Sequence, residues 1–341
     1  MALSDIARKI ESSTNSFTLK RSARQGWRPS VTGYSGYGNA EFVHVLGRVL
    51  MHDPESENSR TWAQRGYRQF FTIQVPRHEV EVTVGGKTVS GTTNHNGYID
   101  VLVHNHGLEP GWHEVTIRAK GADEVTADVL IVGEDVELGV VSDIDDTIMV
   151  TWLPRAMIAA WNSWVKRTDK RAPVAGMASF YRDIAEKHPG VPFIYLSTGA
   201  WNTYDTLVTF MEENGFPRGP LLLTDWGPTP TGLFRNGQEH KRVQLRNLFI
   251  AFPKLRWLLV GDDGQHDPLT YADATAEHPD RVAAVAIRNL SPQEQLLSHG
   301  SLAPLVKANE TGSFDIPLIQ GADGHVPVSY THLTLPTICS V

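Results

Sequence analysis

Three short apolar runs, each followed by polar side chains, are the feature that most constrains how this chain can fold. The runs are Leu138–Ser142, Phe193–Leu196 and Leu258–Gly261. One helical pattern, Met177–Lys187, lies between the first and second runs. Two more, Tyr204–Asn214 and Lys241–Ala251, lie between the second and third. Short buried strands that alternate with helices predict an α/β fold with a parallel sheet, whose ligand lies beyond the carboxyl ends of the strands.

The first run leads directly into Asp143-Ile144-Asp145-Asp146-Thr147. Side chains at positions i and i+2 of an extended segment share a face, so we expect Asp143 and Asp145 to point into one space. Their repulsion must then be relieved by a cation or a proton. One carboxylate can attack phosphorus while the other gives a proton to the leaving alkoxide and later takes one from water. The pair therefore indicates a magnesium-dependent site for phosphoryl transfer, in which the reaction passes through an aspartyl-phosphate.

This pentapeptide has two other interpretations. An EF-hand calcium loop requires Gly at its sixth position and Glu at its twelfth, where this chain has Ile148 and Pro154, so a calcium loop is excluded. An acidic turn that caps a helix remains an alternative for the pentapeptide taken alone.

The other runs deliver further groups of the kind that a phosphatase needs. Ser197 and Thr198 follow the second run, and an acidic stretch from Asp262 to Asp267 follows the third. His240-Lys241-Arg242 opens a helix between them, so a cation can reach the same phosphate. Each residue alone could be structural: a turn hydroxyl, a solvated lysine or an N-cap. The order of acid pair, hydroxyl, lysine and acid pair favours one shared site.

These residues resemble the four motifs of the haloacid dehalogenase (HAD) superfamily of phosphohydrolases. A closer similarity, over about residues 137 to 298, is to the catalytic domain of the actin-patch-type phosphatidate phosphatases. That similarity rests on Ser197–Asp205, on Gly232–Arg235 before His240-Lys241, and on Gly261–Pro268. Gly199-Ala200-Trp201 departs from the Ser-Pro-Trp of that family and puts the fine shape of the pocket in question.

The resemblance implies a role for each motif residue. Asp143 would be the nucleophile and a magnesium ligand, and Asp145 the general acid and base, with its backbone carbonyl on the metal. Asp262 would be the other metal carboxylate, supported by Asp263 or Asp267. The phosphoryl oxygens would be held by Ser197 and Lys241, and further substrate contacts would come from Thr147, Thr198, Trp201, Arg235 and His240. Magnesium suits this oxygen-only set better than zinc, because the motifs offer carboxylates and no cysteine.

Residues 31–133 have a different pattern, in which apolar and polar residues alternate over short runs. Gly85-Gly86 separates two of them as a two-residue hairpin signal. We therefore predict a small antiparallel β-sandwich. Its histidines could be imagined as a zinc site, but scattered on hairpins without cysteine partners they are more typical of surface or satisfied side chains. The alternating runs are Phe42–Leu46, Val80–Val84, Tyr98–Val103 and Trp112–Ile117, and the histidines are His95, His104, His106 and His113.

The complete predicted organisation has five parts. A basic N-terminal arm (1–30) precedes the β-sandwich, the HAD-like domain spans 137–300, and a C-terminal extension spans 301–327. Residues 328–341, including the only cysteine, Cys339, resemble an in-frame translation of a sequencing adapter, in which case the natural C-terminus is missing. Within the HAD-like domain, residues 150–176 are predicted to be a helical insertion that forms a cap. Its face with Trp161 and Trp164 either packs on protein or enters a lipid headgroup region.

Composition narrows the class of partner. The net charge of −7 argues against a dedicated nucleic-acid binder. No apolar run approaches the ~20 residues that span a bilayer, and the N-terminus lacks the pattern of a signal peptide. We therefore expect a cytoplasmic protein, with a peripheral position on anionic membranes as an option, and leave the partner of the β-sandwich open.

Three functions remain open from the sequence. The first is a phosphatidate phosphatase that produces diacylglycerol. The second is a phosphatase of the same mechanism acting on a soluble phosphomonoester. The third is a non-enzymatic adaptor that uses the β-sandwich.

Overall fold

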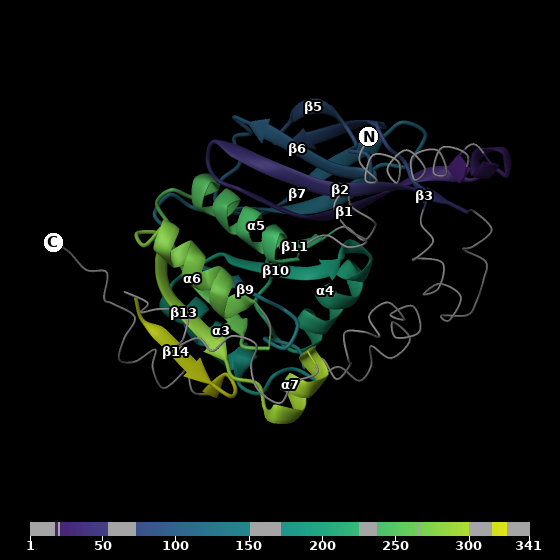
Figure 1. The fold of residues 1–341 in the computed structure, drawn as a ribbon. Coiled ribbons are helices and arrows are strands. Elements are labelled where there is room, and N and C mark those ends of the chain that lie inside the picture. The colour runs from purple at the N-terminus through teal and green to yellow at the C-terminus, as the bar shows by residue number, and fades with distance from the viewer. Residues whose placement is uncertain are drawn as a thin grey trace, which may run out of the picture. The chain divides into compact units, whose positions relative to one another are not determined.

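A computed structural model describes residues 18–19, 21–53, 73–150, 172–224, 237–264, 266–299 and 316–325. The chain divides into two compact units. The first contains residues 1–134 with 200–204 and 224–236, and the second contains the remaining residues (Figure 1). Most of the predicted insertion at 150–176 lies outside the described residues, as do most of the N-terminal arm and the predicted adapter-derived tail.

The first unit is built on one eight-stranded sheet with the order β3-β2-β1-β8-β7-β4-β5, in which β6 also pairs with β2. All four sequence-predicted strands are present. The strands are β1 (Arg28–Gly38), β2 (Phe42–His52), β3 (Ile73–Gln74), β4 (Glu79–Val84), β5 (Lys87–Thr92), β6 (Tyr98–His104), β7 (Gly111–Ala119) and β8 (Val125–Ile131).

Alternation produces the core of this unit. In β4, Val80, Val82 and Val84 are buried while Glu79 and Glu81 are exposed, as the period of two requires. The predicted hairpin is confirmed, because Gly85 and Gly86 both have positive φ and Val84 pairs with Lys87. The expectation of a purely antiparallel sheet is wrong in one place. β1 and β8, the first and last strands of the unit, pair in parallel, since a long stretch of chain separates them and no short turn fixes their direction.

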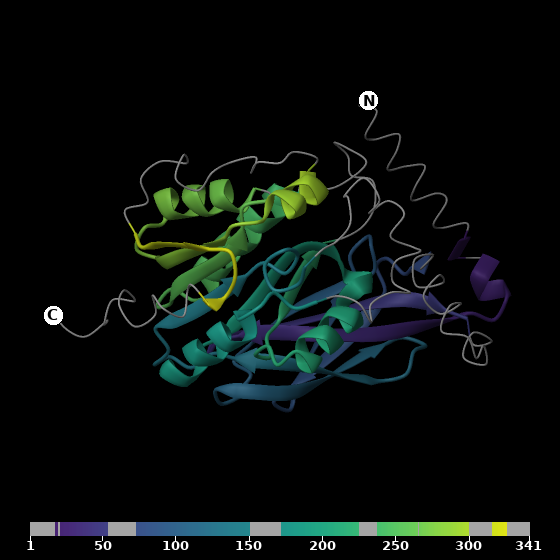
Figure 2. The same ribbon diagram turned by 90° about the horizontal axis from the view of Figure 1, so that it is seen from below.

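The second unit contains the predicted parallel sheet, with the order β11-β10-β9-β12-β13-β14. Its central strand β9 is buried at all five positions, which agrees with a strand covered on both faces. Figure 2 shows α3 and α4 on one face of this sheet and α5 and α6 on the other. The strands are β9 (Leu138–Ser142), β10 (Phe193–Ala200), β11 (Leu221–Thr224), β12 (Arg256–Asp262), β13 (Val282–Arg288) and β14 (Leu318–Gly321).

The helices of this unit begin and end close to the sequence prediction. α3 matches it residue for residue, α4 ends one residue earlier, and α5 begins four residues earlier, at Gly237. The helices are α3 (Met177–Lys187), α4 (Tyr204–Glu213), α5 (Gly237–Ala251), α6 (Asp267–Glu277) and α7 (Pro292–His299), with a 3₁₀ turn η4 (Trp201–Thr203) before α4.

The strand order reverses at β9, which places a switch point where β9 meets β12. From β9 the chain continues to β10 on one side, and β12 lies on the other. Ser142 is paired with Tyr195 of β10 and with Val260 of β12, so the residues just after these three positions emerge at one level. In open parallel sheets this is where ligands bind.

Candidate active site

The site begins where β9 ends. Asp143 follows Ser142, and its backbone N–H donates to the carbonyl of Val260 on β12 at 2.8 Å. The Ser142 hydroxyl donates to the carbonyl of Asp143 at 2.6 Å and therefore accepts from Tyr181 of α3, also at 2.6 Å. These buried contacts fix the backbone on both sides of the Asp143 side chain.

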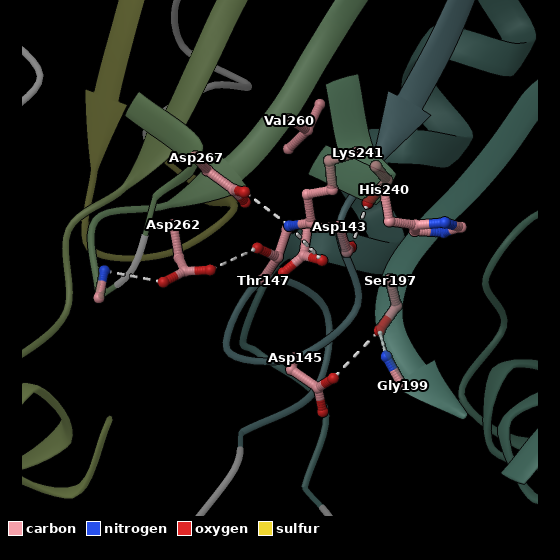
Figure 3. A network of polar contacts seen from close by, with 12 residues as sticks. Asp143, Asp145, Thr147, Ser197, Gly199, His240, Lys241, Val260, Asp262 and Asp267 are labelled. Carbon is pink, nitrogen blue, oxygen red and sulfur yellow. Dashed lines mark hydrogen bonds and ion pairs between the residues drawn. The ribbon is translucent and has the colours of Figure 1, made fainter. Parts of the chain in front are cut away.

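Four buried charged side chains meet beyond the strand ends (Figure 3). Lys241 of α5 lies between two carboxylates, with its Nζ 2.8 Å from Asp143 Oδ1 and 2.6 Å from Asp267 Oδ1. One ligand atom from each of Asp143, Asp262 and Asp267 lies within 4.8 Å of the others. We call Asp143, Lys241, Asp262 and Asp267 the acidic cluster. If all four are ionised its net charge is −2, from three carboxylates and one ammonium.

The electrostatics of the acidic cluster show a shortage of positive charge. Burial raises the pKa of Asp143 from 3.8 to about 7, with Lys241 opposing the shift and Asp267 and Asp145 adding to it. Burial, followed by repulsion from Asp267 and Asp143, raises the pKa of Asp262 well above 3.8. Burial acts to lower the pKa of Lys241, but Asp143 and Asp267 outweigh it and raise that pKa. Lys241 is therefore a cation that only partly neutralises its surroundings.

These residues fit a divalent cation. Among the described residues, Asp267 Oδ2 is buried without a hydrogen-bond partner, as expected for an oxygen whose partner is a ligand. With all four groups ionised, the net charge of −2 in a buried set of carboxylate oxygens suits Mg²⁺, which prefers hard oxygen ligands. Gly261 lets α6 approach β12, because a Cβ at this position would lie 2.4 Å from Asp267 Oδ2.

Asp145 occupies a separate place beside Ser197. The Ser197 hydroxyl donates to Asp145 Oδ2 at 3.2 Å and accepts from the N–H of Gly199 at 2.9 Å. Only part of the sequence expectation holds: the two carboxylates lie near enough for Asp145 to raise the pKa of Asp143, but the strand does not extend through both residues. β9 ends at Ser142, and the chain then turns through hydrogen bonds from Thr147, Ile148 and Met149 to the carbonyl of Ile144. Asp143 therefore faces Lys241 while Asp145 faces Ser197.

Asp263 lies outside the acidic cluster although it adjoins Asp262 in sequence. Its Oδ1 accepts from the N–H of Leu290 at 2.8 Å and from Gln295 Nε2 at 2.6 Å, and its Oδ2 accepts from Asn289 Nδ2 at 3.0 Å. Both oxygens are thus engaged by the chain that follows β13. Of the two acids that the sequence left open as the supporting ligand, the geometry favours Asp267.

The five sequence-predicted substrate contacts are placed differently from one another. Thr147 is fully buried, and its hydroxyl donates to Asp262 Oδ2 at 3.4 Å. Thr198 Cγ2 lies against Gly237, at the start of α5. The His240 ring points away from Asp143, and its Nε2 lies 3.4 Å from the carbonyl of Leu222. Arg235 lies outside the described residues.

Trp201 belongs to the first unit and not to the acidic cluster. Its ring stacks on Tyr34 of β1 with centroids 4.4 Å apart, and Tyr98 and Tyr204 lie near it. The Tyr204 hydroxyl accepts from the N–H of Ser35 at 2.8 Å. The sequence offered no signal for this pairing, because β1 is about 165 residues away from η4.

Sequence reasoning also missed the residues that support the acidic loops from behind. They are Tyr181 on α3 and Arg288, Asn289 and Gln295 around the start of α7. A tyrosine within an apolar helix pattern and an arginine at a strand end are common and carry no motif. Their contacts are fixed only by the fold.

Comparison with known proteins finds a similarity over part of the chain. Residues 138–289 match the family described as "Phosphatidate phosphatase APP1, catalytic domain". Phosphatidate phosphatase APP1 of Saccharomyces cerevisiae is 30% identical over 163 residues, which is 44% of this chain and 26% of that protein. An uncharacterised protein of Schizosaccharomyces pombe is 21% identical over 87% of this chain and 53% of its own length. The chain thus spans between about a quarter and about half of the length of these relatives.

Two solved structures show a distant likeness. The HAD domain of the effector protein Lem4 from Legionella pneumophila has 18% identity and a TM-score of 0.31, covering 46% of this chain and 87% of its own. A carbohydrate acetylesterase from Xanthomonas citri has 11% identity and a TM-score of 0.28, covering 88% of this chain and 72% of its own. These TM-scores are too low for either structure to bear on the site.

Proposed function

We propose that residues 138–289, which match the APP1 phosphatidate phosphatase catalytic domain, form such a domain, and that this protein is a magnesium-dependent phosphatidate phosphatase. It would release phosphate from phosphatidate and leave diacylglycerol. The observation that carries the proposal is the buried acidic cluster of Asp143, Lys241, Asp262 and Asp267 with the Asp145–Ser197 pair beside it. Burying so many charges would be costly without a function for them.

Asp143 is the nucleophile in this proposal. Its carboxylate attacks phosphorus, a new bond forms between a carboxylate oxygen and phosphorus, and the bond from phosphorus to the glycerol oxygen breaks. Lys241, 2.8 Å from Asp143 Oδ1, orients the carboxylate and offers positive charge to the phosphoryl oxygens. The backbone contacts of Asp143 with Val260 and Ser142 hold the nucleophile in place.

Asp145 moves the protons. As a carboxylic acid it protonates the leaving glycerol oxygen, which departs as the hydroxyl of diacylglycerol. As a carboxylate it then takes a proton from the water that attacks phosphorus, so that the aspartyl-phosphate breaks and Asp143 is restored. Ser197 holds Asp145 through the 3.2 Å hydrogen bond, and in this proposal it also contacts a phosphoryl oxygen of the substrate.

Magnesium would be held by Asp143, Asp262 and Asp267, with the backbone carbonyl of Asp145 as a further proposed ligand. When bound, it neutralises the carboxylates and the charge of the transferring phosphoryl group. Thr147 supports Asp262 through its hydroxyl.

The proposed partner is an anionic membrane that carries the substrate, reached from the cytoplasm. Within the described residues no helix is long and apolar enough to cross a bilayer. The predicted membrane-facing side chains, Trp161 and Trp164, lie outside the described residues. Co-sedimentation with phosphatidate-containing vesicles should fall in Trp161→Ala/Trp164→Ala, and unchanged binding would remove these tryptophans from the proposal.

The test of the function is magnesium-dependent phosphate release, with phosphatidate in mixed micelles compared against a panel of soluble phosphomonoesters. We expect the higher kcat/KM on phosphatidate, with Asp143→Asn as the inactive blank. A preference for a soluble ester would retain the mechanism and replace the substrate. If neither class releases phosphate, and magnesium does not change the melting temperature, the adaptor hypothesis becomes the better one.

A further inference from the structure

The chain that leaves β13 contacts both acidic loops of the proposed site. We call Arg288–Ser298 the 288–298 segment. It is fixed to the loop after β12, because Asp263 accepts three hydrogen bonds from it and Ser298 Oγ donates to the carbonyl of Gly264 at 3.0 Å. The backbone N–H of Asp263 also donates to the carbonyl of Arg288 at 3.0 Å. The position of this segment is therefore tied to that of Asp262.

Arg288 extends from this segment to the loop that carries Asp143 and Asp145. Its guanidinium makes three hydrogen bonds: Nη1 to the carbonyl of Asp146 at 2.7 Å, Nη2 to Glu294 Oε1 at 2.6 Å, and Nε to the carbonyl of Ala322 at 3.1 Å. The Arg288 and Glu294 side chains are 9% and 14% exposed. A largely buried ion pair of this geometry holds the guanidinium plane in one orientation.

The acceptor of the Nη1 bond is a strained residue. Asp146 has a φ of +59°, in the left-handed region that non-glycine residues occupy at a cost in free energy. Such a conformation persists where the surrounding structure holds it. Two contacts that hold Asp146 are the Arg288 bond to its carbonyl and the bond from its N–H to the carbonyl of Met149 at 2.8 Å.

We infer that Arg288 is a positioning residue for phosphoryl transfer. Through the Asp146 carbonyl it holds the turn that separates Asp143, which faces Lys241, from Asp145, which faces Ser197. Because Arg288 is anchored to the loop of Asp262, it also sets the distance between the two acidic loops. The inference rests on the proposed function for its effect on turnover, and on the geometry alone for its effect on the loop.

Arg288→Lys tests the inference, because lysine keeps the charge but cannot make the three-way bond of the guanidinium. Arg256→Lys is the matched control. Arg256 Nη2 also donates to a backbone carbonyl, that of Val282 at 3.1 Å, but at the opposite end of the same sheet. We expect kcat of Arg288→Lys to fall on the order of 10- to 100-fold with KM within about twofold, as for misplaced reacting groups. An equal change of kcat in both variants would overturn the inference.

A second measurement does not depend on activity. Amide hydrogen exchange of Thr147, Ile148 and Met149, whose N–H groups bond to the carbonyl of Ile144, should be faster in Arg288→Lys and unchanged in Arg256→Lys. Equal protection in wild type and Arg288→Lys would contradict the inference even if turnover fell. If wild type releases no phosphate, the proposed function fails, and this exchange experiment still decides whether Arg288 holds the loop.

Asp146→Gly provides the rescue. Glycine adopts positive φ readily, so a loop with Gly at 146 needs less support from Arg288. The fold-loss in kcat caused by Arg288→Lys should therefore be smaller in the Asp146→Gly background than in wild type. Equal losses in both backgrounds would show that Arg288 acts by some route other than the Asp146 conformation.

Discussion

The ion pairs described in the first unit are exposed or partly exposed, whereas the second unit has buried pairs as well as exposed ones. In the first unit, Lys120 and Glu79 form an ion pair with side chains 77% and 74% exposed. In the second unit, Lys241, Asp143 and Asp267 are 6%, 5% and 2% exposed. Exposed ion pairs lose little hydration and contribute little to folding stability, whereas buried charges are stable only with close partners of opposite charge. The difference indicates which unit carries the chemistry.

The strand patterns explain why the charged side chains differ in exposure between the two units. β4 alternates exposed and buried residues, so its polar side chains face solvent along its whole length. β9 is buried throughout, so polar side chains can project only beyond its end. A parallel sheet covered on both faces thus concentrates its polar groups at one edge.

The largest expected contrast is in turnover. Asp145→Asn removes the group that moves both protons, and we expect turnover to fall about 10²- to 10⁴-fold without a change in melting temperature. The control in the first unit is Asp100→Asn, which removes the partner of His44 at 2.9 Å and should leave turnover unchanged. Steady-state phosphate release measures both, and near-normal turnover in Asp145→Asn would remove that residue from the mechanism.

The next contrast is in stability. Lys241→Met leaves Asp143 and Asp267 buried without their cation, and we expect it to lower the free energy of unfolding by about 3–5 kcal/mol. Lys120→Met breaks an exposed ion pair and should change the free energy of unfolding by no more than about 0.5 kcal/mol. Urea unfolding of both variants without magnesium provides the comparison. Equal effects would mean that burial does not distinguish the two lysines.

A smaller contrast concerns packing beneath the site. A Cβ on Gly139 of β9 would lie 2.4 Å from the Trp257 ring, so Gly139→Ala should cost about 1–3 kcal/mol of unfolding free energy by overpacking. On β5 of the first unit, a Cβ on Gly91 would meet only the end of Val101, at 2.8 Å. Thermal unfolding should therefore show a smaller drop for Gly91→Ala. The reverse order would show that the core around Trp257 can relax.

The smallest expected effect is a pH dependence. Burial acts to raise the pKa of Glu294, but hydrogen bonds from Arg288 and Ser291 outweigh it and hold that pKa below 4.5. A lowered folded-state pKa means that the carboxylate stabilises the fold above about pH 4.5 and loses this contribution as pH falls through the folded pKa. Glu294→Gln should thus be less stable than wild type by up to about 1 kcal/mol at pH 7.

The same measurement at lower pH checks the sign. The difference in unfolding free energy between Glu294→Gln and wild type should shrink as pH falls below 4.5. Urea unfolding at several pH values measures it. Glu79→Gln, which alters the exposed pair with Lys120, should show a smaller difference at pH 7. A Glu294→Gln difference that grew toward acid would contradict the lowered pKa.

Much of the second unit could be predicted because its signals are local. The period of the apolar residues predicted α3 to the residue and gave the strands β9, β10 and β12, although β10 runs on through Ser197 to Ala200. Local patterns alone did not identify β1, β3, β5 and β8 in the first unit, nor β11, β13, β14, α6 and α7 in the second.

The candidate site divides in the same way. Motif spacing identified Asp143, Lys241, Asp262 and Asp267, and the structure brings them together. Spacing could not choose between Asp263 and Asp267 as the supporting acid. In the structure Asp263 accepts hydrogen bonds from the chain after β13, while Asp267 contacts Lys241. Spacing also assigned Thr147 to the substrate, whereas the buried hydroxyl contacts Asp262.

The sequence by itself determined the alternation of strands and helices, and with it the edge of the sheet where the acids emerge, because both depend on residues close together in the chain. Only the tertiary structure decided that Asp143 faces Lys241, that Asp145 faces Ser197, and that Arg288 contacts Asp146. These contacts join residues between 52 and 142 positions apart. Their partners are selected by strand order and register, which no local pattern encodes.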